Sequence, residues 1–158
     1  MFKVGDKVVY PMHGAGVIEG IEEREVLGVN HKYYVLRIPI GSMKVFIPLD
    51  KVEEVGVRDI VGNKELNEVF AILQGEKNVM STNWNRRYRA NLEKIKSGDI
   101  LAIAEVVKDL TIRDKEKGLS SGEKRMLENA KQILISEIVL AKDIDETRAD
   151  ELLVESFA

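Results

Sequence analysis

The stretch VGVRDIVGNK at residues 55–64 decides how this sequence folds, because the spacing of apolar residues changes within it. Before it, short runs rich in Val, Ile, Tyr and Leu are separated by turns that contain Gly, Pro or Asn. After it, apolar residues recur every three or four positions. The sequence therefore predicts two domains in its 158 residues, a β domain over residues 1–58 and a helical domain over 62–158.

The first domain carries the pattern of an antiparallel sheet. We expect strands at residues 3–10, 16–26, 32–38 and 43–47, joined by short turns. Four or five short strands with tight connections are typical of a small SH3-like or Tudor-like β-barrel or curled sheet.

The second domain carries five helical patterns. Apolar spacing predicts helices from residue 62 onward, and Gly98 and Gly118 stand where helix C-caps are expected. Ser120 opens the fourth helix with Glu123 three positions later, which is the spacing of a capping box. A last short helix is expected from Asp145, so the prediction is an all-α five-helix bundle.

The composition argues against most enzyme classes. There are no cysteines, which excludes disulfides, thiol nucleophiles and thiolate zinc sites. His13 and His31 are the only imidazoles and have no partner at metal-site spacing. With no set of catalytic groups, we expect no enzyme, no metal and no cofactor. No segment approaches 18 uncharged apolar residues, so we expect a cytoplasmic protein with no signal peptide and no membrane contact.

The glycine run at residues 14–20 is similar to a dinucleotide-binding motif. Such a motif must end a strand and open a helix, so that phosphate meets the helix N-terminus. A strand pattern follows here instead, and the run is interpreted as loop and strand.

Residues 81–99 form a basic island in a chain of net charge -3, with five Lys and Arg against two Asp and Glu. Within the island, Trp84, Tyr88, Leu92 and Ile95 share one helical face. One interpretation is an aromatic face buried in the core with a solvated cationic back. The other is a nucleic-acid surface, because Trp84 falls in the first turn, where its ring can extend past the helix end beside three arginines.

Four segments together resemble one family. They are VGDKVVYPMHGAG at 4–16, VGVRDIVG at 55–62, TNWNRRYRANLEKIKSGD at 82–99 and GLSSGEKRMLENAKQIL at 118–134. Over nearly the whole chain, the sequence is similar to the CarD/CdnL family of bacterial transcription regulators. The resemblance implies a Tudor-like domain that docks on the β subunit of RNA polymerase. It also implies a helical domain that touches promoter DNA at the upstream edge of the transcription bubble.

The resemblance also assigns residues. It implies that Trp84 is the DNA wedge and that the basic DNA contacts are Arg86, Arg87, Arg89 and Lys124. In the first domain, Arg24 matches a basic position implicated in polymerase contact. A second such position, an arginine in some relatives, falls on Phe46. Either neighbouring Lys44 replaces it, or the interface is more apolar at this spot.

The expected function is therefore a non-enzymatic regulator that acts as a monomer in the bacterial nucleoid. It would stabilise the open promoter complex by wedging Trp84 into the minor groove, without sequence-specific readout. The alternative is an RNA-binding or ribosome-associated SH3-like protein, since an aromatic and basic surface also stacks on unpaired bases.

Overall fold

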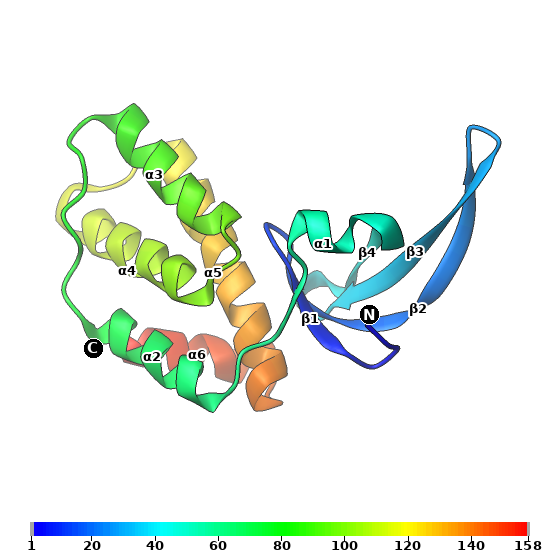
Figure 1. Cartoon of the computed structure of the whole chain (residues 1–158). Helices are drawn as coiled ribbons and strands as arrows, with labels where there is room; N and C mark the ends of the chain where they lie inside the picture. The colour runs from blue at the N-terminus through cyan, green and yellow to red at the C-terminus, as the bar shows by residue number, and fades with distance from the viewer. Residues whose placement is uncertain (1, 158) are drawn as a thin grey trace.

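The computed structural model describes residues 2–157 and shows a sheet followed by a helical domain (Figure 1). The sheet is antiparallel, with strand order β4-β3-β2-β1-β5. Its strands are β1 (Lys7–Tyr10), β2 (Gly14–Val26), β3 (Val29–Ile38), β4 (Met43–Pro48) and β5 (Arg58–Asp59). The prediction of a β domain followed by an α domain is confirmed.

The sheet domain has its own apolar core, made by one face of β1, β2, β3 and β4 and by the short helix α1 (Val52–Val55). Its buried side chains are Val8, Ile18, Tyr34, Leu36, Ile38, Ile47 and Val52. Two 3₁₀ turns (Ile40–Ser42 and Leu49–Lys51) complete the domain. Because side chains alternate along a strand, the opposite face of the sheet carries Tyr33, Val35 and Phe46 together with charged residues such as Arg37.

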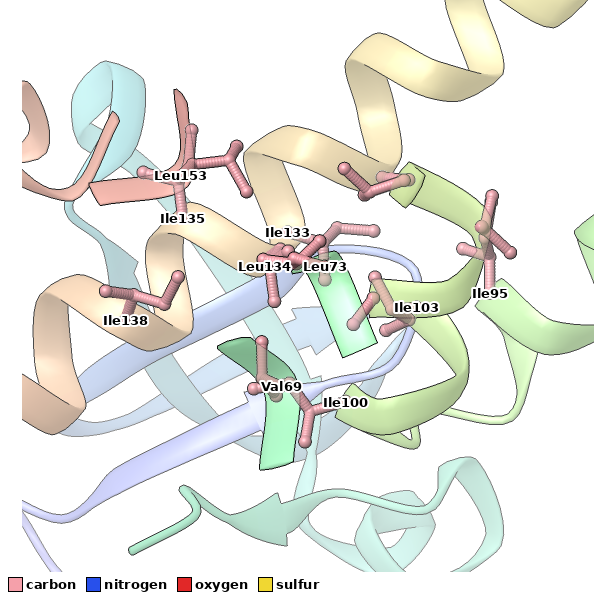
Figure 2. Close-up of a cluster of buried hydrophobic side chains, with 14 of the residues drawn as sticks. Val69, Leu73, Ile95, Ile100, Ile103, Ile133, Leu134, Ile135, Ile138 and Leu153 are labelled. Carbon is pink, nitrogen blue, oxygen red and sulfur yellow. The ribbon is translucent and has the colours of Figure 1, made fainter. Parts of the chain in front are cut away.

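Five further helices form the second domain, as the sequence predicts. They are α2 (Asn63–Gln74), α3 (Trp84–Lys96), α4 (Ile100–Lys117), α5 (Ser121–Lys142) and α6 (Glu146–Ser156). Asn83, Asp99, Ser120 and Asp145 each cap a helix N-terminus with a side-chain oxygen. The apolar faces meet in one core, to which α2, α3, α4, α5 and α6 all contribute (Figure 2).

The two domains are joined along β2 and α5 (Figure 1). The backbone N–H of Ala15 donates to Oγ of Ser136 at 2.8 Å, and the contact is buried. Gly14 has a φ of +112°, and a Cβ at this position would lie 2.8 Å from Oγ of Ser136. The glycine run therefore begins within β2, as interpreted from the sequence, and lets that strand approach the helix closely.

An ion pair reinforces the same junction. The guanidinium of Arg58 on β5 donates two hydrogen bonds of 2.8 Å to the carboxylate of Glu137 on α5. That carboxylate also accepts from the backbone N–H of Val61 at 2.9 Å, and Nε of Arg58 donates to the carbonyl of Gly98 at 2.9 Å. Because Glu137 is almost fully buried and accepts three hydrogen bonds, these bonds tie the sheet and the helices into a defined arrangement.

Candidate nucleic-acid interface

Trp84 is the first residue of α3 and lies at the surface. It is 41% exposed, and it follows Asn83, whose side chain accepts from the N–H of Arg86. The indole stacks on Tyr88 with ring centroids 4.9 Å apart and an interplanar angle of 17°. Gly122 on α5 lies beside both rings, and a Cβ at this position would be 3.5 Å from the indole and 3.8 Å from Tyr88. Trp84 thus combines an exposed portion with a fixed stacking partner.

Ser120 links Trp84 to the start of α5. Its Oγ accepts a 2.9 Å hydrogen bond from Nε1 of Trp84 and a 3.2 Å bond from the N–H of Glu123. The hydroxyl is also within 3.3 Å of Oε1 of Glu123, to which it can donate. One donor and two acceptor positions are all that a hydroxyl offers, so Ser120 is saturated.

Only half of the predicted capping box at Ser120 and Glu123 is formed. The backbone N–H of Glu123 binds Ser120, but its carboxylate is taken up by Arg87 in place of the Ser120 backbone N–H. Nε and Nη2 of Arg87 lie 2.8 and 3.1 Å from the two carboxylate oxygens. Nη1 of Arg87 donates to the carbonyl of Ser81 at 3.2 Å, so the pair also holds the chain that leads into α3.

Arg87 is therefore not where the sequence prediction placed it. Its side chain is 4% exposed and its partner's is 2% exposed, so both charges are buried. The reason is the neighbouring helix, which presents a carboxylate at the first turn of α5. We leave Arg87 out of the candidate DNA contacts.

In the buried pair, the pKa of each group is shifted so that its charged form is favoured. The hydrogen bond from Arg87 holds the pKa of the Glu123 carboxyl below its usual range, although burial acts in the opposite direction. The same hydrogen bond raises the pKa of Arg87. Both groups therefore stay ionised around neutral pH.

The other predicted DNA contacts are on the surface. Arg86 and Arg89 on α3 and Lys124 on α5 are exposed and close no ion pair within residues 2–157. Lys124 is in the first turn of α5, the same turn that carries Gly122 beside Trp84. Exposed basic residues thus occur on both helices that contribute to the setting of Trp84, α3 and α5.

The sequence interpretation passed over Arg125, which neighbours Lys124. Arg125 is exposed and lines a hollow of about 300 Å³ together with Tyr88, Leu92 and Met12. Its position beside the aromatic stack depends on how α5 crosses α3. Only the adjacency of two cations, Lys124 and Arg125, could have signalled it in the sequence.

A second exposed surface lies on the outer face of the sheet. The β-ladder pairs Glu22 with Tyr33 and Arg24 with His31. It also pairs Val35 with Phe46 and Arg37 with Lys44, so all these side chains share a face.

Arg24 and Phe46, both singled out in the sequence, are in contact. The guanidinium carbon of Arg24 lies 4.0 Å from the centroid of the Phe46 ring, a cation–π distance. Arg24 also pairs with Glu22 at 3.2 Å, and both side chains are about half exposed. Lys44 is further along β4, where it pairs with Glu19 at 3.5 Å.

Two other kinds of site are not found in the region the structure covers. Within residues 2–157, no three His, Asp or Glu side chains gather as metal ligands would. None of the helices described has both the length and the apolar character needed to cross a bilayer.

Fold and surface together define a class of protein. A small antiparallel sheet with an aromatic and basic outer face is joined to a helical domain that presents a partly exposed tryptophan among arginines. The family models agree with this division: "CarD-like/TRCF RID domain" matches residues 2–61, and "CarD, C-terminal domain" matches residues 68–154. The chain belongs to the CarD family.

A curated relative supports this assignment, and two solved structures share part of the sequence. The chain is 44% identical over 146 residues to the putative transcription factor YdeB of Bacillus subtilis, covering 92% of this chain and 95% of that protein. The N-terminal domain of CarD from Myxococcus xanthus, solved by NMR, is 34% identical, with a TM-score of 0.32 over 37% of this chain and 79% of that one. The CdnL N-terminal domain from the same organism is 47% identical, with a TM-score of 0.33 over 39% and 86%.

Proposed function

We propose that this protein is a non-enzymatic transcription regulator that docks on the β subunit of RNA polymerase and stabilises the open promoter complex. Membership of the CarD family supports the regulatory role, and the match to the RID domain supports polymerase as the partner of the sheet domain. The place of action is then the bacterial nucleoid.

The observation that carries the DNA part of the proposal is the setting of Trp84. Its indole is partly exposed and held in one orientation by Tyr88 and Ser120, with the exposed cations Arg86 and Arg89 on the same helix. A flat ring that is already oriented loses little conformational freedom when it stacks against an unpaired base or a groove wall. Nearby arginines supply phosphate contacts that carry no sequence information.

The energetics favour a tethered mode of action. A few phosphate contacts give only weak non-specific affinity at physiological salt, roughly 10⁻⁴ to 10⁻⁶ M. Docking on polymerase raises the local concentration of the helical domain at the promoter. Since polymerase has already separated the strands, the wedge favours the melted state without meeting the full cost of unstacking.

The test compares two surfaces in a promoter assay with purified polymerase. The double variant Arg86→Glu/Arg89→Glu should lose stabilisation of open complexes while still binding polymerase. Arg24→Glu should lose polymerase binding. Lys96→Glu is the matched control, because it is an exposed cation about 15 Å further along the same helix.

Two results would contradict the proposal. One is an unchanged open-complex lifetime in the Arg86→Glu/Arg89→Glu variant. The other is copurification with ribosomal material and not with polymerase, which would favour an RNA-binding role.

A further inference from the structure

A basic hollow of about 210 Å³ lies next to the start of α3. Its walls are the loop at residues 77–82, which leads into the Asn83 cap, and two cations of α4, Arg113 and Lys117. The loop is attached to α4, because the backbone N–H of Asn78 donates to the buried carboxylate of Asp109 at 2.9 Å. The hollow is thus a built feature of the fold.

Of the three cations that line the hollow, only Lys77 forms an ion pair within residues 2–157. Lys77 forms an ion pair with Glu116 and is partly neutralised. Arg113 and Lys117 close no ion pair with any carboxylate in the described part of the chain. An anion in the hollow would supply the partner that these two charges lack among the described residues.

The hollow is continuous with the surface around Trp84. Ser81 and Thr82 line it, and their carbonyls accept from the guanidinium of Arg87 behind them. Thr82 precedes Trp84 by two residues. A nucleic-acid strand that meets the indole and runs along this loop would bring a neighbouring phosphate to Arg113 and Lys117.

We infer that Arg113 and Lys117 form a phosphate-binding subsite for the DNA strand that meets Trp84. The inference rests on the proposed function and enlarges its contact surface from α3 and α5 to α4. The occupant is a backbone phosphate, because the hollow offers two cations and no base-reading amide pair on α4. Binding at this subsite is electrostatic and independent of sequence.

The experiment measures how the affinity of the full chain for a labelled forked duplex varies with salt, by fluorescence anisotropy between about 50 and 200 mM. Lys117→Gln and Arg113→Gln should each reduce the slope of log K against log salt by about 0.9. Lys115→Gln is the matched control, because Lys115 is an exposed cation in the same last turn of α4 but does not line the hollow. Its slope should equal that of the unmodified protein.

The outcomes separate this inference from the proposed function. If Lys117→Gln and Arg113→Gln keep the full slope while Arg86→Gln reduces it, the subsite is refuted and the proposed function stands. If Arg86→Gln also keeps the full slope, the proposed DNA contact fails with it. Lys117 is exposed, so its variant decides the question even if Arg113→Gln unfolds.

Discussion

Nε1 of Trp84 donates a 2.9 Å hydrogen bond to Oγ of Ser120, a residue 36 positions later that caps α5. The orientation of the indole is thus set by a second helix. Behind Ser120, Glu123 and Arg87 form a buried ion pair that holds the first turns of α3 and α5 together. The partly exposed indole therefore rests on Ser120 and, behind it, on the buried pair of Arg87 and Glu123.

Trp84→Ala should reduce function more than stability. Trp84 is 41% exposed, and its truncation removes one stack and one hydrogen bond, each worth about 0.5 to 1.5 kcal/mol, so the cost should be about 1 to 3 kcal/mol. Truncating a fully buried aromatic residue costs about 3 to 5 kcal/mol. Urea denaturation and open-complex lifetime, measured on the same preparation, test the difference. A loss of stability in the higher range would mean that Trp84 is chiefly structural.

Ser120 should hold the Trp84 indole in place, and this effect should be separable from its role as the N-cap of α5. Ser120→Gly removes the acceptor of the indole hydrogen bond but costs only a few tenths of a kcal/mol as an N-cap. Trp84 is the only tryptophan, so its fluorescence reports directly on the change. We expect greater quenching by acrylamide and a shorter open-complex lifetime.

A double-variant comparison controls the Ser120 prediction. Phenylalanine has no N–H, so in a Trp84→Phe background the change Ser120→Gly should have no further effect on open-complex lifetime. Equal effects of Ser120→Gly in both backgrounds would show that Ser120 acts only through α5.

The Arg87–Glu123 pair should make stability depend on pH on the acid side. The folded-state pKa of Glu123 is lowered, so its stabilisation is complete above the unfolded value of about 4.3 and is lost as pH falls further. Urea denaturation at neutral pH and below pH 4 measures this loss. The paired variant Arg87→Met/Glu123→Leu should lack it. Arg87→Ala alone should cost about 3 to 5 kcal/mol at neutral pH, because it leaves a buried carboxylate unpaired.

A second acidic group needs a control in that experiment. The hydrogen bond from Lys77 lowers the pKa of Glu116, but Glu116 is exposed. Glu116→Gln should therefore change the acid dependence very little. An acid dependence that disappears in Glu116→Gln and persists in the paired variant would contradict the assignment to Glu123.

Arg24 and Phe46 should act as a unit in polymerase binding. The cation–π contact fixes the guanidinium over the ring and is worth about 0.5 to 1 kcal/mol at an exposed site. Arg24→Met and Phe46→Leu should each weaken binding to the isolated β subunit, and together by less than the sum. Lys32→Glu is the control, because Lys32 is exposed on the opposite face of the same hairpin. Additive effects would mean that the two side chains bind separately.

Periodicity and turn residues predicted four of the five strands, the five long helices and the cap at Ser120, because these depend on local sequence, but missed β5 and the short helix α1. The resemblance to a family supplied the candidate contacts, which periodicity alone left open between core and surface. The burial of Arg87 could not be predicted, since it depends on Glu123 lying on a neighbouring helix. The contact of Arg24 with Phe46 likewise depends on the strand register of β2, β3 and β4.

The junction between Arg58 and Glu137 has a consequence for promoter choice. That ion pair and Ser136 hold the sheet against the helices, so in the proposed docked state the distance from the polymerase surface to the Trp84 ring would be fixed. A melted region displaced by one base pair moves its edge by about 3.4 Å, which a rigid spacer cannot follow. The protein would then discriminate among promoters by the position of the bubble edge, a geometric selectivity that needs no reading of bases.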